Sequence, residues 1–230
     1  EGAATAIGAL TTKAIEGYAA QEQLVGGVET LFKTSSDTVV GYANDAYKTA
    51  GMSANEYMET VTSFSASLLA SMNNDTVAAA EKANVAITDM SDNANKMGTS
   101  MESIQNAYQG FAKQNYTMLD NLKLGYGGTK SEMERLIGDA NKLAKAQGQA
   151  GNLTIESYAD VVEAIHLVQD NMGITGTTAK EASTTIQGSI GAMKSAWSNL
   201  LTGMADENAN FDTLMENLID SIGTVIQNIV

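Results

Sequence analysis

The chain has 230 residues, a formal net charge of -14 and an isoelectric point near 4.3. This acidity argues against nucleic acid as a primary partner, because phosphate contacts need a basic surface. The absence of cysteine excludes disulfides, thiolate metal sites and a cysteine nucleophile, and the absence of proline, the main helix breaker, favours an all-α fold.

The first third of the chain predicts three helices. Residues 3–33 place apolar side chains at helical spacing and are interrupted only by Gly26-Gly27, so we expect one long helix with a possible kink there. A second helix opens at Ser36-Asp37. Ser53 and Glu56 form a capping box, in which each side chain satisfies a free amide at a helix start, and a third helix follows to about Met72.

The middle of the chain repeats the same start signals. A fourth helix is expected after Asn73-Asn74-Asp75 and ends near Gly98, and Thr99 to Glu102 is a second capping box. Residues 115–124 are a candidate short helix. A third capping box, Thr129 to Glu132, begins the helix that follows a glycine loop.

The last third predicts longer helices. Thr154 is the expected cap of a helix that runs to about Val168, and Thr178 to Glu181 is a fourth capping box. The turn Asp206 to Asn210 separates that helix from a last amphipathic one. We therefore expect an all-α, multi-helix bundle of roughly eight helices, with longer helices at both ends.

The expected organisation has three parts. Residues 1–35 form an N-terminal long helix, residues 36–172 form a compact helical domain, and residues 173–230 form C-terminal helices that continue into the rest of a longer protein. Residues 98–150 are close to neutral between two acidic flanks. Chance placement of solvated faces and packing of the middle against an acidic surface both explain this pattern.

One segment, Gly98 to Leu136, gathers aromatic residues and glycines. We expect packing residues there, together with one tryptophan further on that packs either in the core or in an adaptable interface; the set is Tyr108, Phe111, Tyr116, Leu119, Leu122, Tyr126 and Trp197. Glycine pairs and runs predict hinges, because glycine gives the backbone freedom; these are Gly125, Gly127, Gly128, Gly173 and Gly176.

Candidate catalytic groups are few. His166 is the only histidine, so a metal site would have to rely on carboxylates; its expected role is a helix-surface or capping histidine, with Asp170 one turn away as an acceptor. Glu156, Asp160 and Glu163 share a helix face, which is more typical of a solvated stripe than of an acid and base pair. The glycine loop lacks the spacing of a phosphate-binding loop. We expect no catalytic residue, no cofactor, no metal site and no enzymatic activity.

Several segments resemble one known family. They are Gln23–Phe32, Ala43–Gly51, Ser53–Ser65, Asp89–Gly98, Ile104–Thr117, Met118–Lys130 and Gly173–Gln187. Together they closely resemble the tail tape measure proteins of long, flexible-tailed bacteriophages and prophages of Gram-positive hosts. The similarity extends from about residue 14 to 205, and coverage rather than any single motif carries it.

The resemblance implies a structural virion protein in the lumen of the phage tail tube, made in the bacterial cytoplasm, that sets tail length during assembly and leaves ahead of the DNA. It implies self-association, with a trimer in the full-length protein, and contacts with tail tube and tail assembly chaperone proteins. No direct sequence-specific nucleic acid binding is expected.

Other features bear on how the chain relates to membranes and to a longer protein. No apolar run approaches the ~18 residues of a membrane span. The chain lacks an initiator Met and runs uncapped to Val230, which predicts an internal fragment. Two alternatives remain: a secreted or surface helical-bundle interaction protein, and a non-catalytic helical part next to a peptidoglycan hydrolase domain.

Overall fold

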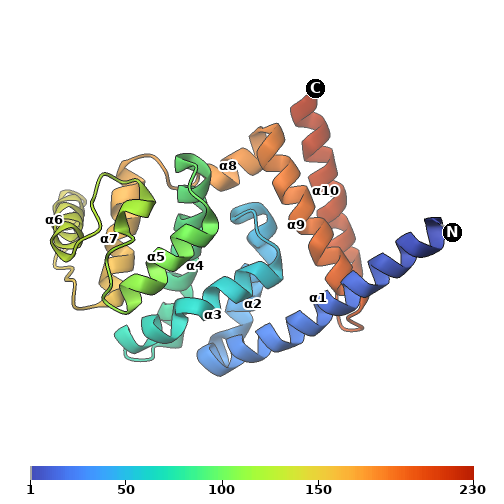
Figure 1. Ribbon diagram of the computed structural model, residues 1–230, viewed down its shortest axis with the longest axis horizontal. Coiled ribbons are helices and arrows are strands. Elements are labelled where there is room, and N and C mark those ends of the chain that lie inside the picture. The colour runs from blue at the N-terminus through green and yellow to red at the C-terminus, as the bar shows by residue number, and fades with distance from the viewer. Residues whose placement is uncertain (1) are drawn as a thin grey trace. The chain divides into compact units, whose positions relative to one another are not determined.

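The computed structural model describes the backbone of residues 2–230 and the side chains from residue 4 onward. Within these residues the fold is all-helical, without a strand, and a long helix lies at each end, which confirms the predicted fold class (Figure 1). The helices are α1 (Gly2–Phe32), the 3-10 helix η1 (Lys33–Ser35), α2 (Ser36–Thr49), α3 (Ala54–Ser71), α4 (Thr76–Met97), α5 (Met101–Ala112), the 3-10 helix η2 (Leu119–Leu122), α6 (Lys130–Ala146), α7 (Tyr158–Asn171), α8 (Thr177–Thr184), α9 (Ile186–Met204) and α10 (Phe211–Ile229).

The chain forms two compact units. Unit 1 joins the N-terminal residues up to Glu59 with Ala179–Val230, and unit 2 is Thr60–Thr178. This division differs from the expected boundaries at 35/36 and 172/173. Residues 36–59 belong with the C-terminal helices because α2 packs against α9 and because the Asn199 side chain accepts a hydrogen bond of 2.8 Å from Ala54 N.

Unit 1 is built around α9, against which α1, α2 and α10 pack. Its buried cluster consists of Tyr47, Ala196, Leu200 and Leu218. Close helix approach needs small residues: a side chain at Gly203 would collide with Leu214 of α10, and one at Gly17 would collide with Thr202. The predicted kink at Gly26-Gly27 does not interrupt the helix, because α1 continues to Phe32.

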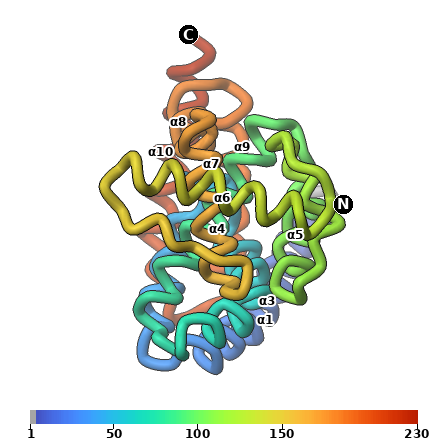
Figure 2. Tube along the Cα trace, turned by 90° about the vertical axis from the view of Figure 1, so that its left-hand side faces the viewer, coloured from blue at the N-terminus to red at the C-terminus, as the bar shows by residue number. Residues whose placement is uncertain are grey.

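Unit 2 is built around α4 and α7. The helix α7 packs against α4 on one side and against α6 on another, and α5 packs against α4 and η2 (Figures 1 and 2). Its core consists of fully buried apolar side chains, among them Ile87, Met90, Ile104, Leu119, Leu122, Met133 and Leu136. Where two of these residues share a helix they lie three positions apart, which places them on one face.

Helix starts agree with the sequence where both capping partners are local. Ser53 Oγ accepts from Glu56 N, and Glu56 Oε2 accepts from Ser53 N, so the first capping box is complete. Thr129 Oγ1 caps α6 by accepting from Glu132 N, while the Glu132 carboxylate turns to Gly127 N instead of Thr129 N. The predicted box there is therefore half formed.

Three predicted helix starts were wrong. The cap of α5 is Ser100, which accepts from Ser103 N, and not Thr99. The cap of α7 is Ser157, three residues after Thr154. Thr178 does not cap α8, whose first turn instead donates to a carboxylate from α4. In each of these places a neighbouring or distant acceptor satisfies the free amides better than the expected residue does.

Candidate functional site

The aromatic segment of unit 2 is a stacked core. The Tyr108 and Phe111 ring centroids lie 5.8 Å apart, and those of Phe111 and Tyr116 lie 6.3 Å apart. All three side chains are buried, as are Leu119 and Leu122 of η2. Such contacts between rings add to the stabilisation that apolar burial provides. These five predicted packing residues thus lie together.

Tyr126 lies outside this stack, against α6. Its hydroxyl donates to Asp139 Oδ2 at 2.6 Å, and the Arg135 guanidinium lies 4.3 Å from its ring centroid. Burial, followed by the hydrogen bond to Asp139, raises the pKa of Tyr126 to about 12. The side chain is half-buried, so it fixes the loop to the surface of α6 more than it fills a core.

The glycine loop is tied to the start of α6. Arg135 donates to Gly125 O at 2.8 Å, and Gly127 N donates to Glu132 Oε1 at 3.1 Å. Arg135, and next the Gly127 amide, lower the pKa of Glu132 to about 2. Gly125 has a φ of 92°, which favours glycine, and a side chain at Gly128 would collide with the Thr117 carbonyl. Glycine is thus required at two of the three loop positions predicted as hinges.

The second pair of predicted hinges follows α7. Gly173 and Gly176 both have positive φ, 73° and 85°. Gly176 N is fixed by a hydrogen bond, described below, so this turn is anchored. A hinge role for either glycine group stays a prediction.

Trp197 lies apart from the other predicted packing residues. It lies in α9 of unit 1, far along the chain from the aromatic segment, and 43% of the residue is exposed. Its neighbours Ala196 and Leu200 are among the residues that α9 buries. Trp197 is therefore a surface residue of the described fold.

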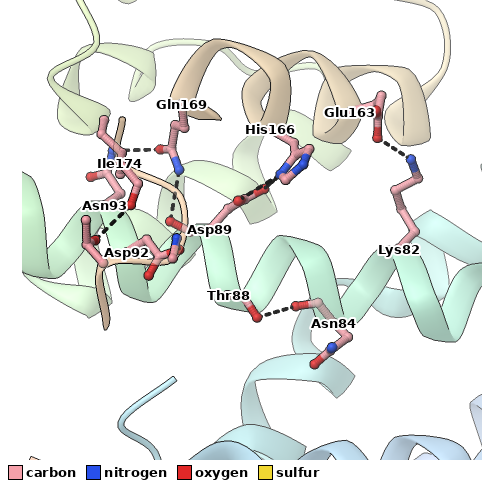
Figure 3. Close-up of polar contacts among 12 residues, drawn as sticks. Lys82, Asn84, Thr88, Asp89, Asp92, Asn93, Glu163, His166, Gln169 and Ile174 are labelled. Atoms are coloured by element: carbon pink, nitrogen blue, oxygen red, sulfur yellow. Dashed lines mark hydrogen bonds and ion pairs between the residues drawn. The ribbon is translucent and has the colours of Figure 1, made fainter. Parts of the chain in front are cut away.

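A polar layer that the sequence did not predict joins α4 to α7 (Figure 3). Asp89 is 1% exposed, and His166 Nδ1 lies within hydrogen-bond distance of both of its carboxylate oxygens, at 3.0 and 3.1 Å. The predicted partner of His166, Asp170, is not the partner found. Burial raises the pKa of Asp89 to about 6, and the hydrogen bond to Asp89 raises the pKa of His166.

The same layer continues one turn further along α4. Asn93 Nδ2 donates to Leu122 O at 2.9 Å and to Gln169 Oε1 at 2.8 Å, and Gln169 Nε2 donates to Asp89 O at 3.1 Å. Asn93 and Gln169 are fully buried. Buried polar groups need such partners, so this network fixes the register of α7 on α4.

Asp92 completes the layer by capping α8. Its two carboxylate oxygens accept from Gly176 N at 2.8 Å and from Thr178 N at 2.9 Å. Asp92 is fully buried, and the partial positive charge at the start of a helix stabilises a carboxylate there. A sequence signal existed: three polar residues at Asp89, Asp92 and Asn93 lie in line with the apolar Ala86 and Met90, on a face that α4 buries.

The predicted acidic stripe does not lie on one helix face, because Glu156 is in the turn before α7; Asp160 and Glu163 lie on α7 and make structural contacts. Asp160 Oδ2 accepts from Thr154 N at 3.0 Å, and Glu163 pairs with Lys82 of α4 at 2.5 Å. Among the described residues, no group of three or more His, Asp or Glu side chains is arranged to hold a metal ion. The arrangement in this part of unit 2 positions helices, and it contains Asp89, whose pKa is raised to about 6, beside His166, whose pKa is also raised.

Comparison with known proteins gives no family assignment. No protein-family model matches the chain, no curated protein sequence does, and no solved structure does. Of the helices in residues 2–230, none is long and apolar enough to cross a membrane.

Proposed function

We propose that the chain is a helical segment of a phage tail tape measure protein, a structural virion protein that sets tail length and leaves ahead of the DNA. One observation supports this most directly. Three of the seven segments that carry the sequence resemblance contact one another in unit 2. Asn93 of Asp89–Gly98 bonds to Leu122 of Met118–Lys130, and Asp92 bonds to the backbone of Gly173–Gln187.

These contacts are relevant because two helical proteins of similar composition can resemble each other in sequence without having the same buried contacts. Acidic, alanine-rich helices match each other easily by composition alone, whereas buried hydrogen bonds between distant segments require particular residues at particular places. Three of the resembling segments thus supply residues to one buried hydrogen-bonded network.

The proposal places the chain in the lumen of the tail tube, after synthesis in the bacterial cytoplasm. Its partners there are other copies of the same protein, the tail tube protein and the tail assembly chaperones. An all-helical chain suits a length-setting role, since the α-helix gives a fixed rise of about 1.5 Å per residue.

Peptide mass spectrometry of purified phage particles tests this assignment. Peptides from the chain should appear in tails separated from heads and should be lost from particles that have ejected their DNA. Peptides found on the bacterial surface or in the medium, and absent from particles, would contradict the proposal and favour a surface interaction protein.

The proposal also assigns no enzymatic activity to the chain. A peptidoglycan zymogram of the purified chain should therefore show no clearing, with lysozyme as the positive control. A clear band at the mass of the chain, 24.1 kDa, would contradict this part of the proposal and identify a muralytic domain.

A further inference from the structure

The helices α9 and α10 form an antiparallel hairpin in unit 1. The turn between them spans residues 205–210. Gly203 lies against Leu214 near the turn, and at the open end Asn228 Nδ2 donates to Thr185 O at 3.0 Å. The two helices, 19 residues each, are therefore paired along their whole length (Figure 1).

An apolar seam runs along α10 beside the face that contacts α9. Leu218 and Val225 are buried, whereas Ile219 is 59% exposed and Ile229 is 64% exposed. The seam residues recur at intervals of four, three, four and three; they are Met215, Ile219, Ile222, Ile226 and Ile229. This is the spacing of the two core positions of a heptad repeat, and isoleucine at both positions favours bundles of more than two helices.

The helix α9 carries a second seam with the same spacing. Its residues recur at intervals of four and three over the whole helix; they are Ile186, Ile190, Met193, Trp197, Leu200 and Met204. Leu200 is buried, and the others are half-buried or exposed. Met193 and Met215 both pack at the margin of the buried cluster, so the two seams border the same core.

Both seams lie on the same side of the hairpin. On α9 the exposed Trp197 comes one position after the buried Ala196, and on α10 the exposed Ile219 comes one position after the buried Leu218. Successive residues turn by about 100° around a helix axis, in the same sense on both helices. Because the helices are antiparallel, equal turns away from their contact bring both seams to one side.

The other side of the hairpin faces the rest of unit 1. A pocket there is lined by Ser189 and Ala192 of α9, by Ser221 and Thr224 of α10, and by Tyr47 of α2, all in unit 1. Ala192, Ser221 and Thr224 are turned away from the seams around their helix axes, and Ser189 lies at the edge between the two sides of α9. Unit 1 thus covers one side of the hairpin and leaves the two-helix apolar face, defined by the two seams, open.

We propose that this apolar face is a dimer interface, in which two copies of the chain pack hairpin against hairpin as a four-helix bundle. The exposed parts of its side chains offer on the order of 700 Å² of apolar surface, close to what each partner of a stable pair buries and more than monomers usually expose. A two-fold axis makes one such face complementary to itself.

The composition of the face favours a second copy over a charged partner. None of the seam residues is charged, although the chain carries a net charge of -14. Two acidic chains repel each other, and a neutral interface keeps that repulsion away from the contact. This inference rests on the geometry of α9 and α10 in the 230-residue chain and does not use the trimer that the tape measure resemblance implies for the full-length protein.

Trp197 provides a direct readout, because it is the only tryptophan and lies within the apolar face. The experiment combines sedimentation equilibrium with tryptophan fluorescence on the 230-residue chain, over protein concentrations from below 1 μM to above 100 μM. Wild type should reach twice the monomer mass of 24.1 kDa, and its emission maximum should shift to shorter wavelength over the same concentration range.

Two variants separate the face from other surfaces. Ile222→Lys combined with Ile226→Lys should give a monomer with wild-type helical circular dichroism and red-shifted emission, since both side chains are exposed in the chain alone. Val77→Lys, at an exposed apolar residue of α4, should dimerise as wild type does. The proposal would be overturned if wild type sedimented as a monomer or a trimer, or if its emission maximum did not change with concentration. It would also be overturned if the double variant still dimerised.

Discussion

Two buried carboxylates, Asp89 and Asp92, connect α4 to its neighbours in unit 2 by different chemistry. Asp89 meets an ionisable partner, His166, and Asp92 meets only backbone amides. Removing a charge from the first changes how stability depends on pH. Removing the second leaves donors without acceptors, which costs about 1–3 kcal/mol for buried groups.

The pKa of Asp89 predicts a fall in stability as pH rises. Its folded value of about 6 lies above the unfolded value of about 3.9, so the folded chain binds more protons than the unfolded chain between these values. This contribution to stability is complete below pH 4 and is lost as pH rises through 6. The raised pKa of His166 extends the loss in the same direction at higher pH.

Asp89→Asn tests this linkage, since asparagine keeps an acceptor for His166 and does not titrate. We expect the unfolding free energy of wild type minus that of the variant to fall between pH 4 and pH 7 by about 2–3 kcal/mol. Urea unfolding at four pH values measures it. A difference that stays constant, or rises with pH, would show that Asp89 is not buried as a titrating group.

Asp92→Ala and Thr178→Ala form a matched pair at the start of α8. The first variant strips the acceptors from Gly176 N and Thr178 N and should cost about 1–3 kcal/mol. The second removes a buried hydroxyl that has no partner within the described residues and should change stability by less than about 0.5 kcal/mol. Equal losses of stability in the two variants would indicate that Thr178 caps α8.

At the scale of elements, helix existence follows from the sequence better than helix starts do. The apolar spacing of residues 130–146 and the Ser53 capping box are local patterns, and both appear in the structure as predicted. The start of α8 could not be predicted in this way, because its acceptor, Asp92, lies 86 residues from Thr178. The pairing of His166 with Asp89, 77 residues away, could not be predicted for the same reason.

The glycine loop before α6 makes a prediction of its own. Gly128→Ala places a methyl group against the Thr117 carbonyl and should destabilise the chain by about 1–3 kcal/mol. Gly138→Ala in α6 meets nothing within 4 Å and should stabilise it by about 0.5–1 kcal/mol, because alanine favours the helix. Thermal unfolding of both variants checks the contrast, and a neutral Gly128→Ala would mean that the loop is loosely packed.

At the scale of the whole molecule, the division into two units could not be predicted from the order of helices along the sequence. Unit 1 takes helices from both ends of the chain, joined by contacts such as Asn199 with Ala54, 145 residues apart. Periodicity describes each helix but not which distant helix covers it. The same limit applies to Trp197, because its helical spacing suggested core or interface packing and did not say which; its side chain lies on an open face.

The central claim, that the chain is part of a length-setting tail protein, predicts a change in tail length when the chain is duplicated. In-frame duplication of its 230 residues in the parent gene adds at most about 345 Å of fully helical protein. Electron microscopy of negatively stained particles should show tails longer by up to this amount and of uniform length. Tails of unchanged length, in particles shown to contain the enlarged protein, would contradict the account.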